Sequence, residues 1–582
     1  MSMKTSTKIS SLLALVLLSV TAVSCGDRYM QEMNTDSSKA TVMDPNSLLT
    51  TALLQTYGDF SMMDTYRSYI TGFSQYLAGG WNVTAYAGSV HADNAQMSNL
   101  WNRMYGVGIK NLVDGIANSA GLPNVNAVLR ITRVYMMSVL TDTYGDVPCS
   151  EAGLGFISGI SNPKYDTQES IYDFFFTELA ACVAQLDGSK DRVSGDVTAY
   201  KGDLNKWRKF ANALRMRFAM RISDVNPAKA RTEFEAAVAA GTFSDIEDDA
   251  YVIYMDAPFT LYEGARELDF RANALGEMLY GQDFSSPSFV CATFFNKLQS
   301  TSDPRLYRFC RHYINTKRSS TQADDLGNVD VTDEVRAWEA SNGGPHPCTV
   351  GAAWYCVWVN GPATDDIPTL KRLVESDPAA GYDDDASKSR MVHPFLSIDF
   401  EKASRPGILM TYAEVNFLLA EAKSKGWNIT GTTEELFKVG VRASMQLINK
   451  HYVPESRAIT EAEIADFLAG LLAGVNLDNA EKAREIINTQ AWVLHLTNPS
   501  EGWANVRRSD YPVLVDRGQL PKYDGFTYDD NNLSTPVRLK YPNMESKYNS
   551  AAYAEAVGRA PLNGKDDWHT KVWWDKFDGH FE

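Results

Sequence analysis

The sequence predicts a mainly α-helical protein with long irregular loops. Several segments carry apolar residues at helical spacing, and motifs that cap helices stand at their starts. No segment alternates strongly enough between apolar and polar residues for an extended sheet. The chain has 582 residues, 44% of them hydrophobic, which is ample for a large core or for two to four domains by length alone.

Apolar side chains form stripes along one face of the predicted helices. The members of these stripes are Trp207, Phe210, Leu214 and Phe218; Val415, Leu418, Leu419 and Ala422; and Phe437, Val441, Ser444 and Ile448. Each set recurs at intervals of three or four residues, so each is expected to face the core of the protein.

Short motifs mark where helices start and stop. The pairs with capping-box spacing are Thr432 with Glu435, Thr460 with Glu463 and, with Asp in the first position, Asp166 with Glu169 before residues 171–184. Gly426 is expected to end the helix that carries Leu418. The stretches between helices are rich in Gly, Pro, Ser and aromatic residues, at about 79–93, 255–290, 316–364, 374–394 and 509–550. Loops of this length usually carry function or are disordered.

The N-terminus has the pattern of an export signal. Lys4 and Lys8 precede an apolar run from Leu12 to Val23, and the run ends at Ser24 and Cys25. A run of this length is too short to span a bilayer. A signal that ends at Cys is similar to that of a bacterial lipoprotein, so we expect residues 1–24 to be removed and Cys25 to be acylated. Cleavage near Ala22 without acylation is the alternative.

The expected mature chain has a tether followed by one large domain. Residues 25–45 are polar and short-sided, which favours a tether, and residues 46–582 form the predicted helical domain. The net charge is −17, and removal of Lys4 and Lys8 makes it −19. Such an acidic chain repels phosphate backbones, which argues against a nucleic-acid partner.

No cofactor, metal or catalytic residue is predicted from a motif. The eight His are scattered, and HExxH, GxSxG, P-loop and CxxC motifs do not occur. Asp383–Asp385 could offer oxygen ligands to calcium, but the Gly and distal Glu of an EF-hand are missing, so a solvated turn is favoured. Cys348 and Cys356 are expected either to pair across a loop or to stay free buried thiols.

A family resemblance follows from several short blocks taken in order. They include TDTYGDVP at 141–148 and FANALRMR at 210–217. The full set covers 141–152, 207–221, 303–305, 410–422, 489–492, 501–512, 536–549 and 573–575. Together, behind a lipoprotein-like signal, they resemble the SusD/RagB family of outer-membrane nutrient-binding lipoproteins of Bacteroidetes.

The resemblance implies a SusD-like scaffold of tetratricopeptide-type helix pairs with a ligand face built from irregular loops. It implies a lipid-anchored protein on the outer face of the outer membrane. Its partner would be a SusC-like TonB-dependent transporter, to which it delivers oligosaccharides or, in the RagB branch, peptides. Family members are not enzymes. The blocks themselves look structural, and Arg215, Arg217 and Arg221 are expected to pair with Glu414, Glu421 or Glu501.

Candidate ligand contacts are aromatic residues that lie on loops. Exposed aromatic rings stack on the apolar faces of sugars while nearby polar groups bind the hydroxyls. The candidates are Trp81 and Tyr86; Trp354, Tyr355 and Trp358; and Tyr262 with Arg266. Trp207, Trp492 and Trp503 fall inside the structural blocks and are assigned to the core. For Trp354 and Trp358 the alternative is one shared helical face, buried together.

Three classes of function remain open from the sequence. The first is a glycan-binding uptake lipoprotein, with a peptide-binding one as its variant. The second is a surface glycoside hydrolase, because paired carboxylates leave no sequence signature. The third is a protein-interaction scaffold without a small ligand.

Overall fold

The structure is a computed structural model that describes residues 42–256, 270–280, 289–315, 328–357, 361–378, 394–529, 532–577 and 581. Contacts group Pro45–Glu582 into one unit, which is mainly helical, as predicted. Cys25 lies outside the described residues. Within the described part, no helix combines the length and the apolar character needed to cross a bilayer.

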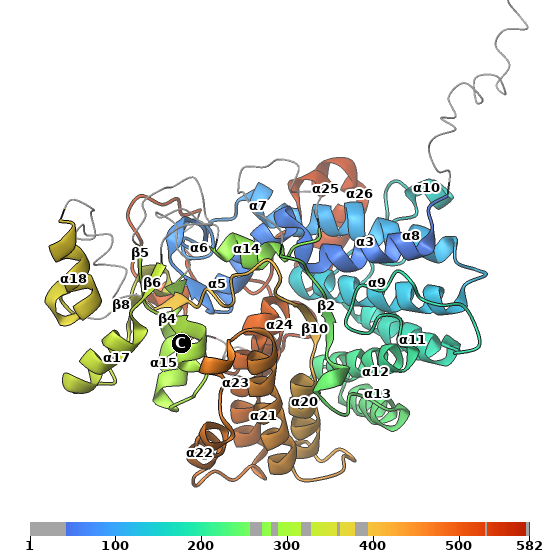
Figure 1. Ribbon diagram of the computed structural model, residues 1–582. Coiled ribbons are helices and arrows are strands. Elements are labelled where there is room, and N and C mark those ends of the chain that lie inside the picture. Colours follow the sequence, from blue (N-terminus) through green and yellow to red (C-terminus); the bar gives the residue numbers. More distant parts are fainter. Residues whose placement is uncertain are drawn as a thin grey trace, which may run out of the picture. The chain divides into compact units, whose positions relative to one another are not determined.

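The first group of helices forms a stack (Figure 1). Its members are α3 (Pro45–Gly58), α4 (Phe60–Thr65), α5 (Thr71–Phe73), α6 (Gly80–Ala85), α7 (Asn94–Arg103), α8 (Lys110–Ala117), α9 (Pro123–Tyr144), α10 (Gly155–Ser158), α11 (Gln168–Gln185), α12 (Leu204–Arg221) and α13 (Pro227–Ala240). Successive long helices pack as pairs, α8 on α9, α9 on α11, α11 on α12 and α12 on α13. Most side chains of α9 are buried, because helices cover it on several sides.

A second group of helices comes from the C-terminal part of the chain. Its members are α20 (Tyr412–Ser424), α21 (Thr433–His451), α22 (Glu461–Leu471), α23 (Ala480–Leu494), α24 (Pro499–Ser509), α25 (Asn543–Tyr548) and α26 (Ser550–Gly558). Helices α20 and α21 form a tight pair, and α23 and α24 pack beside it. Because α20 also packs on α12, the two groups share a core. Paired helices in this order are the scaffold that the resemblance implies.

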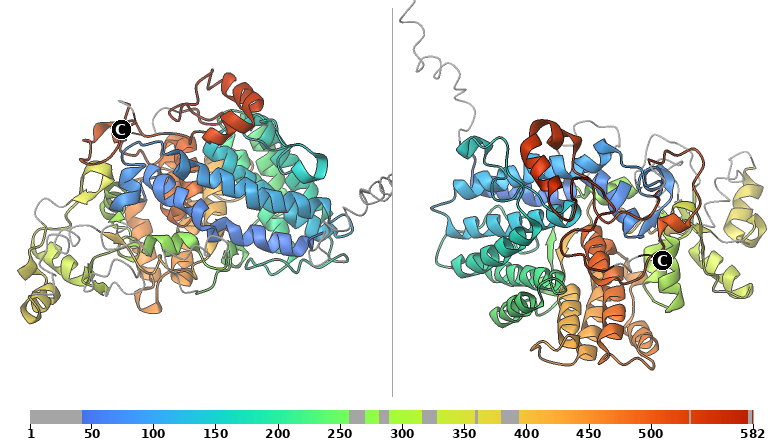
Figure 2. Two further views of the ribbon diagram at one scale, coloured as in Figure 1. Left: turned by 90° about the horizontal axis from the view of Figure 1, so that it is seen from above. Right: turned by 180° about the vertical axis from the view of Figure 1, so that it is seen from behind.

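Short helices from the middle of the chain, together with short strands, lie beside these groups (Figure 2). The helices are α14 (Ala274–Tyr280), α15 (Ala292–Ser300), α16 (Leu306–Phe309), α17 (Thr332–Ser341) and α18 (Pro368–Ser376). The strands are β1 (Leu77–Ala78), β2 (Ala250–Val252), β3 (Phe289–Val290), β4 (Cys310–Arg311), β5 (Tyr313–Asn315), β6 (Asn328–Asp330), β7 (Thr349–Val350), β8 (Cys356–Val357), β9 (Phe395–Leu396) and β10 (Gly407–Met410).

All described strand pairs are antiparallel and short. The largest sheet has the order β1-β3-β9-β4, and the pairs β2 with β10, β5 with β6 and β7 with β8 stand apart from it. None of these strands exceeds four residues, which agrees with the weak alternation in the sequence.

Most of the predicted helix ends are confirmed. Thr432 and Thr460 form complete capping boxes with Glu435 and Glu463. Gly426 follows the end of α20 with φ of 76°, a left-handed conformation that favours glycine.

The predicted start at Asp166 is wrong by one residue. Thr167 is the cap of α11, and its side chain accepts from the N–H of Ser170. The Asp166 carboxylate instead accepts the N–H groups of Cys149 and Ser150, so it fixes the turn after α9.

The arginines of α12 make buried ion pairs, as expected for two of the three. Arg217 binds both oxygens of Glu414 at 2.6 and 2.7 Å, and Arg221 Nη2 donates to Glu501 at 2.5 Å. Arg215 departs from the prediction and pairs with Glu233 of the neighbouring α13 at 2.9 Å. Buried guanidiniums need such partners, so these pairs fix how α12, α20 and α24 pack together.

Candidate ligand-binding face

Three loop segments that lie far apart in the sequence meet at one surface. They are residues 79–92, the β7–β8 hairpin and residues 517–529. Thr84 Oγ1 lies 3.1 Å from the hydroxyl of Tyr355, whose ring meets that of Tyr523 edge-on at 5.9 Å. The His91 ring lies 2.6 Å from an oxygen of Asp529. We call the aromatic loop face the surface made by Tyr86, Tyr355, Tyr523, Phe526 and Tyr528.

The hairpin that carries Tyr355 turns sharply. Its strands pair Thr349 with Val357 and Val350 with Cys356. Between them Ala353 and Trp354 have φ of 52° and 60°, a left-handed conformation that L-residues rarely adopt. This turn buries the Trp354 side chain completely, and its indole N–H donates to the carbonyl of Val515 at 3.2 Å. The ring of Tyr355, the next residue, stays partly exposed.

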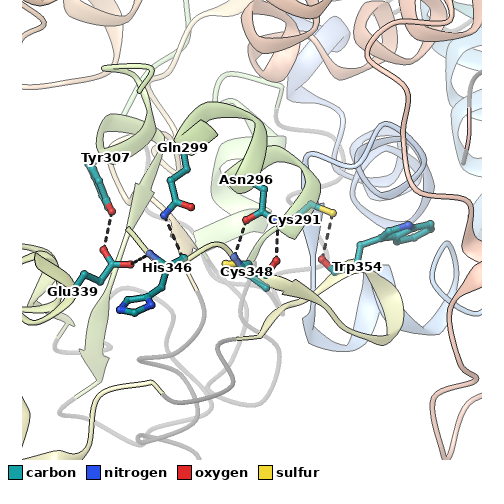
Figure 3. Close-up of a disulfide and its surroundings, with 9 residues drawn as sticks. Cys291, Asn296, Gln299, Tyr307, Glu339, His346, Cys348 and Trp354 are labelled. Atoms are coloured by element: carbon teal, nitrogen blue, oxygen red, sulfur yellow. Dashed lines mark hydrogen bonds between the residues drawn. A yellow bond between two sulfur atoms is a disulfide. The ribbon is translucent and has the colours of Figure 1, made fainter. Parts of the chain in front are cut away.

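A disulfide within this hairpin, and hydrogen bonds to α15 and to Cys291 at its start, hold the hairpin in place (Figure 3). Cys348 and Cys356 form a disulfide, which decides between the two alternatives left open by the sequence. The Asn296 side chain exchanges two hydrogen bonds of 2.7 Å with the backbone of Cys348, and the Cys291 thiol donates to the carbonyl of Trp354 at 3.3 Å. The hairpin is therefore closed by its own disulfide and held at Cys348 and at its tip.

Gly79 allows the first segment to approach the hairpin. Its φ is 72°, and a Cβ built there would lie 1.9 Å from a ring carbon of Phe289 and 2.8 Å from the ring of Tyr355. Only glycine fits at this position without displacing both rings. Helix α6 begins directly after it and carries Thr84, the hydrogen-bond partner of Tyr355.

Arg517 fixes the third segment to the first. Its side chain is buried and donates to the carbonyl of Gly88, to that of Leu520 at 2.8 Å and to that of Pro521 at 2.9 Å. The exposed tip that follows holds Tyr523, whose ring meets Phe526 at 5.2 Å, and Tyr528, whose hydroxyl accepts from the N–H of Tyr523. The tip is thus packed by its own aromatic rings.

The phenols of Tyr355 and Tyr86 stay neutral at physiological pH. Burial raises the pKa of Tyr355 to about 12, although its hydrogen bond to Thr84 acts in the opposite direction. Burial also raises the pKa of Tyr86. Neutral phenols can both donate and accept hydrogen bonds, and their rings offer apolar surface. The face can therefore bind a ligand that has apolar patches beside hydroxyl groups.

The predicted contacts are placed as follows. Tyr86 and Tyr355 lie on the aromatic loop face. Trp354 is a correction: a fully buried indole has no surface for a ligand, and its role is to anchor the hairpin. Trp81 lies in α6, with its side chain outside the described part of the structure. Tyr262, Arg266, Trp358 and the acidic run Asp383–Asp385 also lie outside the described residues. Trp207, Trp492 and Trp503 are buried, as predicted.

Sequence reasoning missed the tip at residues 523–528. Tyr523, Phe526 and Tyr528 alternate there with Asp, Gly and Thr, the same mixture of aromatic and turn residues that marked the other candidate loops. Tyr523 is 38% exposed, so its ring is available to a ligand.

A buried cluster of Glu414, His495 and Glu501 brings three possible metal ligands within 4.8 Å of one another. Two guanidiniums compete with any cation there, because Arg217 and Arg221 already bind the carboxylates. Burial acts to raise the pKa of Glu501, but the charges of Arg221 and Arg217 outweigh it and hold the pKa below its ordinary value. The cluster is therefore better explained as an ion-pair network of the core.

Comparisons with known proteins match this chain to one family model and to several solved structures. A family model described as "Starch-binding associating with outer membrane" matches residues 37–336 and 375–542. A structure titled "Bacteroidetes AC2a SusD-like" is 37% identical, with a TM-score of 0.82 over 92% of this chain and 100% of that one. A chitin-binding protein is 29% identical, with a TM-score of 0.68 over the same shares.

A more distant structure shows the fold alone. It is a putative outer membrane protein from Bacteroides vulgatus, described as probably involved in nutrient binding. It is 20% identical, with a TM-score of 0.63, and covers 92% of this chain and 100% of that one. A search of the curated proteins found no match.

Proposed function

We propose, on the premise that this chain belongs to the SusD-like family of starch-binding proteins associated with the outer membrane, that its aromatic loop face binds glycans. The observation that carries the proposal is the position of the Tyr355 ring. Its ring is partly exposed on a hairpin fixed by a disulfide, it meets the ring of Tyr523, and its hydroxyl is hydrogen-bonded to Thr84. A ring held in this way can stack on a sugar without losing further conformational freedom.

A glycan suits this face better than a peptide does. The aromatic rings of the face are flanked by Thr84, His91 and Asp529. These polar side chains can bind the hydroxyl groups around a stacked sugar. The chitin-binding neighbour, 29% identical over nearly the whole chain, supports an oligosaccharide as the ligand class. The proposed role is binding and not catalysis, in keeping with the family description.

We place this binding step at the cell surface. The signal-like N-terminus favours acylation at Cys25, and the family description supports association with the outer membrane. In this proposal the protein faces the exterior and passes its glycan to a SusC-like TonB-dependent transporter.

The binding proposal is tested by screening the purified protein against starch, chitin and other oligosaccharides and against a peptide library. Oligosaccharide hits are then titrated calorimetrically. Tyr355→Ala and Tyr523→Ala should each weaken binding about fivefold or more, because each removes a stacking surface worth about 1 kcal/mol. Tyr548→Ala is the matched control, because this tyrosine is 71% exposed on α25, outside the aromatic loop face.

The same screen separates the competing functions. Binding of peptides alone would overturn the glycan proposal and favour a peptide-uptake protein. Release of reducing ends from a polysaccharide would favour a glycoside hydrolase.

The delivery step needs a separate experiment. Purification of the native complex from solubilised outer membranes should recover a TonB-dependent transporter in stoichiometric amount. Recovery of the protein without such a partner would contradict delivery while leaving glycan binding intact.

A further inference from the structure

A pocket of about 200 Å³ lies between α15, the end of α22 and α23, and we call it the α15–α23 pocket. Lys297, Leu298 and Thr301 form the wall on the side of α15, and Leu471 and Val475 close the end beside α22. The opposite wall is one face of α23, because its lining residues recur every three or four positions. These residues are Lys482, Glu485, Ile486, Thr489, Gln490 and Val493.

The α15–α23 pocket is separate from the aromatic loop face, although α15 contributes to both. Asn296 and Gln299 hold the segment that leads into the β7–β8 hairpin, through hydrogen bonds to its backbone. Lys297 and Leu298 line the pocket and lie about half a turn away around the same helix, at about 100° per residue. A ligand in the pocket would therefore sit on the opposite side of α15 from the hairpin.

Gln490 presents a hydrogen-bond donor to the pocket. Its side chain is 3% exposed, and its carbonyl oxygen accepts from Nη2 of Arg305. Because a guanidinium only donates, this contact decides which end of the amide is the oxygen, and the NH₂ group lies on the other side. Within the described part of the chain, Nε2 has no hydrogen-bond partner and is not fully buried, so it is open to the pocket. An acceptor atom on a ligand would satisfy it.

Arg305 holds this amide in a fixed orientation. The guanidinium is fully buried, its Nε and Nη2 donate to Asp303 at 2.9 and 2.5 Å, and its Nη1 donates to Ser444 at 2.9 Å. Rotation of the guanidinium would break these bonds, so the group that orients Gln490 is itself fixed. The donor is therefore preorganised for a ligand.

Lys297 supplies the surplus charge of the pocket. Two basic and two acidic side chains line it. Asp303 is neutralised by Arg305, and Glu485 pairs with Lys482 at 2.7 Å. The half-buried Lys297 forms no ion pair with any side chain that the structure describes, so one positive charge has no counter-charge. The α15–α23 pocket therefore attracts a group with a single negative charge.

The rest of the wall is apolar. Leu298, Ile486 and Val493 are buried, Leu471 and Val475 are half-buried, and all five side chains are aliphatic. An apolar cavity of about 150 Å³ holds benzene. The volume of about 200 Å³ therefore fits a ligand slightly larger than benzene.

We propose that the α15–α23 pocket binds an aliphatic monocarboxylate of about six carbon atoms, a size that follows from its volume. The carboxylate binds Gln490 Nε2 and the ammonium group of Lys297, and the alkyl chain packs on Leu298, Ile486 and Val493. One ligand thus satisfies the open donor, compensates the surplus charge and covers the aliphatic wall. This site does not depend on the glycan proposed for the aromatic loop face.

The wall disfavours other small ligands. A sugar would place hydroxyl groups against aliphatic side chains without hydrogen-bond partners. A doubly charged phosphate would carry more charge than Lys297 compensates and would leave the aliphatic wall uncovered. An aliphatic amine would be repelled by Lys297 and would bring a donor to the Gln490 donor.

The test uses the full-length protein with isocaproate as the probe, and binding is followed by saturation-transfer NMR and calorimetric titration. Isocaproate should bind at least about tenfold more tightly than acetate, which lacks the alkyl chain, or isohexanol, which lacks the charge. Saturation of the protein methyl groups should transfer mainly to the methyl groups of the probe, because these contact the aliphatic wall.

Variants locate the binding in the α15–α23 pocket. Lys297→Gln should weaken isocaproate binding about tenfold, because it removes the charge-assisted contact. Thr489→Phe should abolish binding, because it places a ring in the pocket, and thermal melting checks that this variant remains folded. Lys206→Gln is the matched control, since this half-buried lysine lies on α12 outside the pocket, and it should leave binding unchanged.

The inference is overturned if isocaproate fails to bind at about 20 mM, a concentration that would detect even weak affinity. It is equally overturned if acetate or isohexanol binds as tightly as isocaproate, or if Lys297→Gln and Lys206→Gln bind it equally well. Tyr355→Ala should retain isocaproate binding, so failure of glycan binding at the aromatic loop face would not affect these outcomes.

Discussion

Tyr355 reaches the aromatic loop face because the two residues before it adopt a left-handed backbone conformation. Ala353 and Trp354 each have positive φ, which costs about 1–2 kcal/mol per residue for an L-amino acid. Full burial of the Trp354 indole contributes about 2–3 kcal/mol in return, and its hydrogen bond to Val515 adds to this. The tryptophan thus stabilises the turn that presents its neighbour.

Gly79→Ala tests how closely the first segment must approach the hairpin. The new methyl group would collide with Phe289 and Tyr355, and the positive φ of Gly79 would add strain. We expect a loss of about 1–3 kcal/mol in the free energy of unfolding, measured in urea, and weaker glycan binding by calorimetry. Gly188→Ala is the control, because a Cβ there meets no atom within 4 Å, and it should change stability by less than about 0.5 kcal/mol. Wild-type binding in Gly79→Ala would contradict this account.

At the residue scale, the sequence predicts which loops carry aromatic residues but not which rings are exposed. Tyr86 and Tyr355 lie partly exposed on the aromatic loop face, whereas Trp354 is buried. The difference depends on the positive φ values of Ala353 and Trp354, which no spacing pattern indicates.

Helix ends are the elements that the sequence predicts best, because capping is local. Thr432 and Thr460 cap their helices through residues three positions away. The sequence alone does not decide the start of α11, since Asp166 and Thr167 are both good caps. Contacts with Cys149 and Ser150, distant in sequence, decide that Asp166 serves the preceding turn.

Glu421→Gln tests the buried pair that joins α20 to α24. Glu421 binds Arg508 at 2.6 and 2.8 Å, and both side chains are 2% exposed. Burial acts to raise the pKa of Glu421, but Arg508 outweighs it and lowers the pKa to about 2. The substitution leaves Arg508 buried without its counter-charge, so we expect a loss of about 3–5 kcal/mol at pH 7, measured by urea unfolding.

The stability lost in Glu421→Gln should become smaller as the pH falls. A depressed carboxyl pKa contributes stability above the unfolded value of 4.5, and this contribution disappears as the pH falls towards about 2. The difference between wild type and Glu421→Gln should therefore shrink by about 3 kcal/mol over that range. Glu434→Gln, at an exposed pair on α21, should cost less than about 0.5 kcal/mol. A difference that stays constant with pH would contradict the assigned pKa.

The β7–β8 hairpin gives a second test at the scale of an element. Replacement of Cys348 and Cys356 by Ser removes a disulfide that closes a loop with a sequence separation of 8. A loop of this size predicts a loss of about 2–3 kcal/mol in the free energy of unfolding. Hydrogen exchange at residues 349–357 should increase, and glycan binding should weaken because Tyr355 is less firmly held. A reductant should weaken binding in the wild type and have no effect on the double variant. Tight binding by that variant would show that the disulfide does not position Tyr355.

At the scale of the whole molecule, periodicity predicts helices but not how they assemble. The pairing of α12 with α20 and α24 depends on Arg217, Glu414, Arg221 and Glu501, whose partners lie about 200 to 280 residues apart. The sequence identified these charges as partners because buried arginines need carboxylates. The sequence does not indicate that Arg215 pairs with Glu233, since several acidic residues are equally suitable as its partner.

Cys25→Ala tests the proposed anchor. Without the acylated cysteine the protein should move from the membrane fraction to the soluble fraction, because the chain loses its only proposed lipid attachment. Its glycan affinity should equal that of the wild type, since the aromatic loop face lies within Pro45–Glu582. Fractionation followed by calorimetry gives both measurements. Cys182→Ser, which alters a buried cysteine of α11, should leave the location unchanged. Membrane retention of Cys25→Ala would contradict the anchor.

The hydrogen bonds at the base of each loop also affect how the ligand preference of such a protein can change in evolution. Gln75 binds the backbone of Val515, Arg517 binds the carbonyl of Gly88, and Asn296 binds the backbone of Cys348, so each tip is fixed by residues outside the aromatic loop face. The tips can then be exchanged one at a time while the base is retained. A chimaera that receives residues 523–528 from a relative should inherit part of that relative's glycan preference on an unaltered frame, and selection could explore new polysaccharides by the same route.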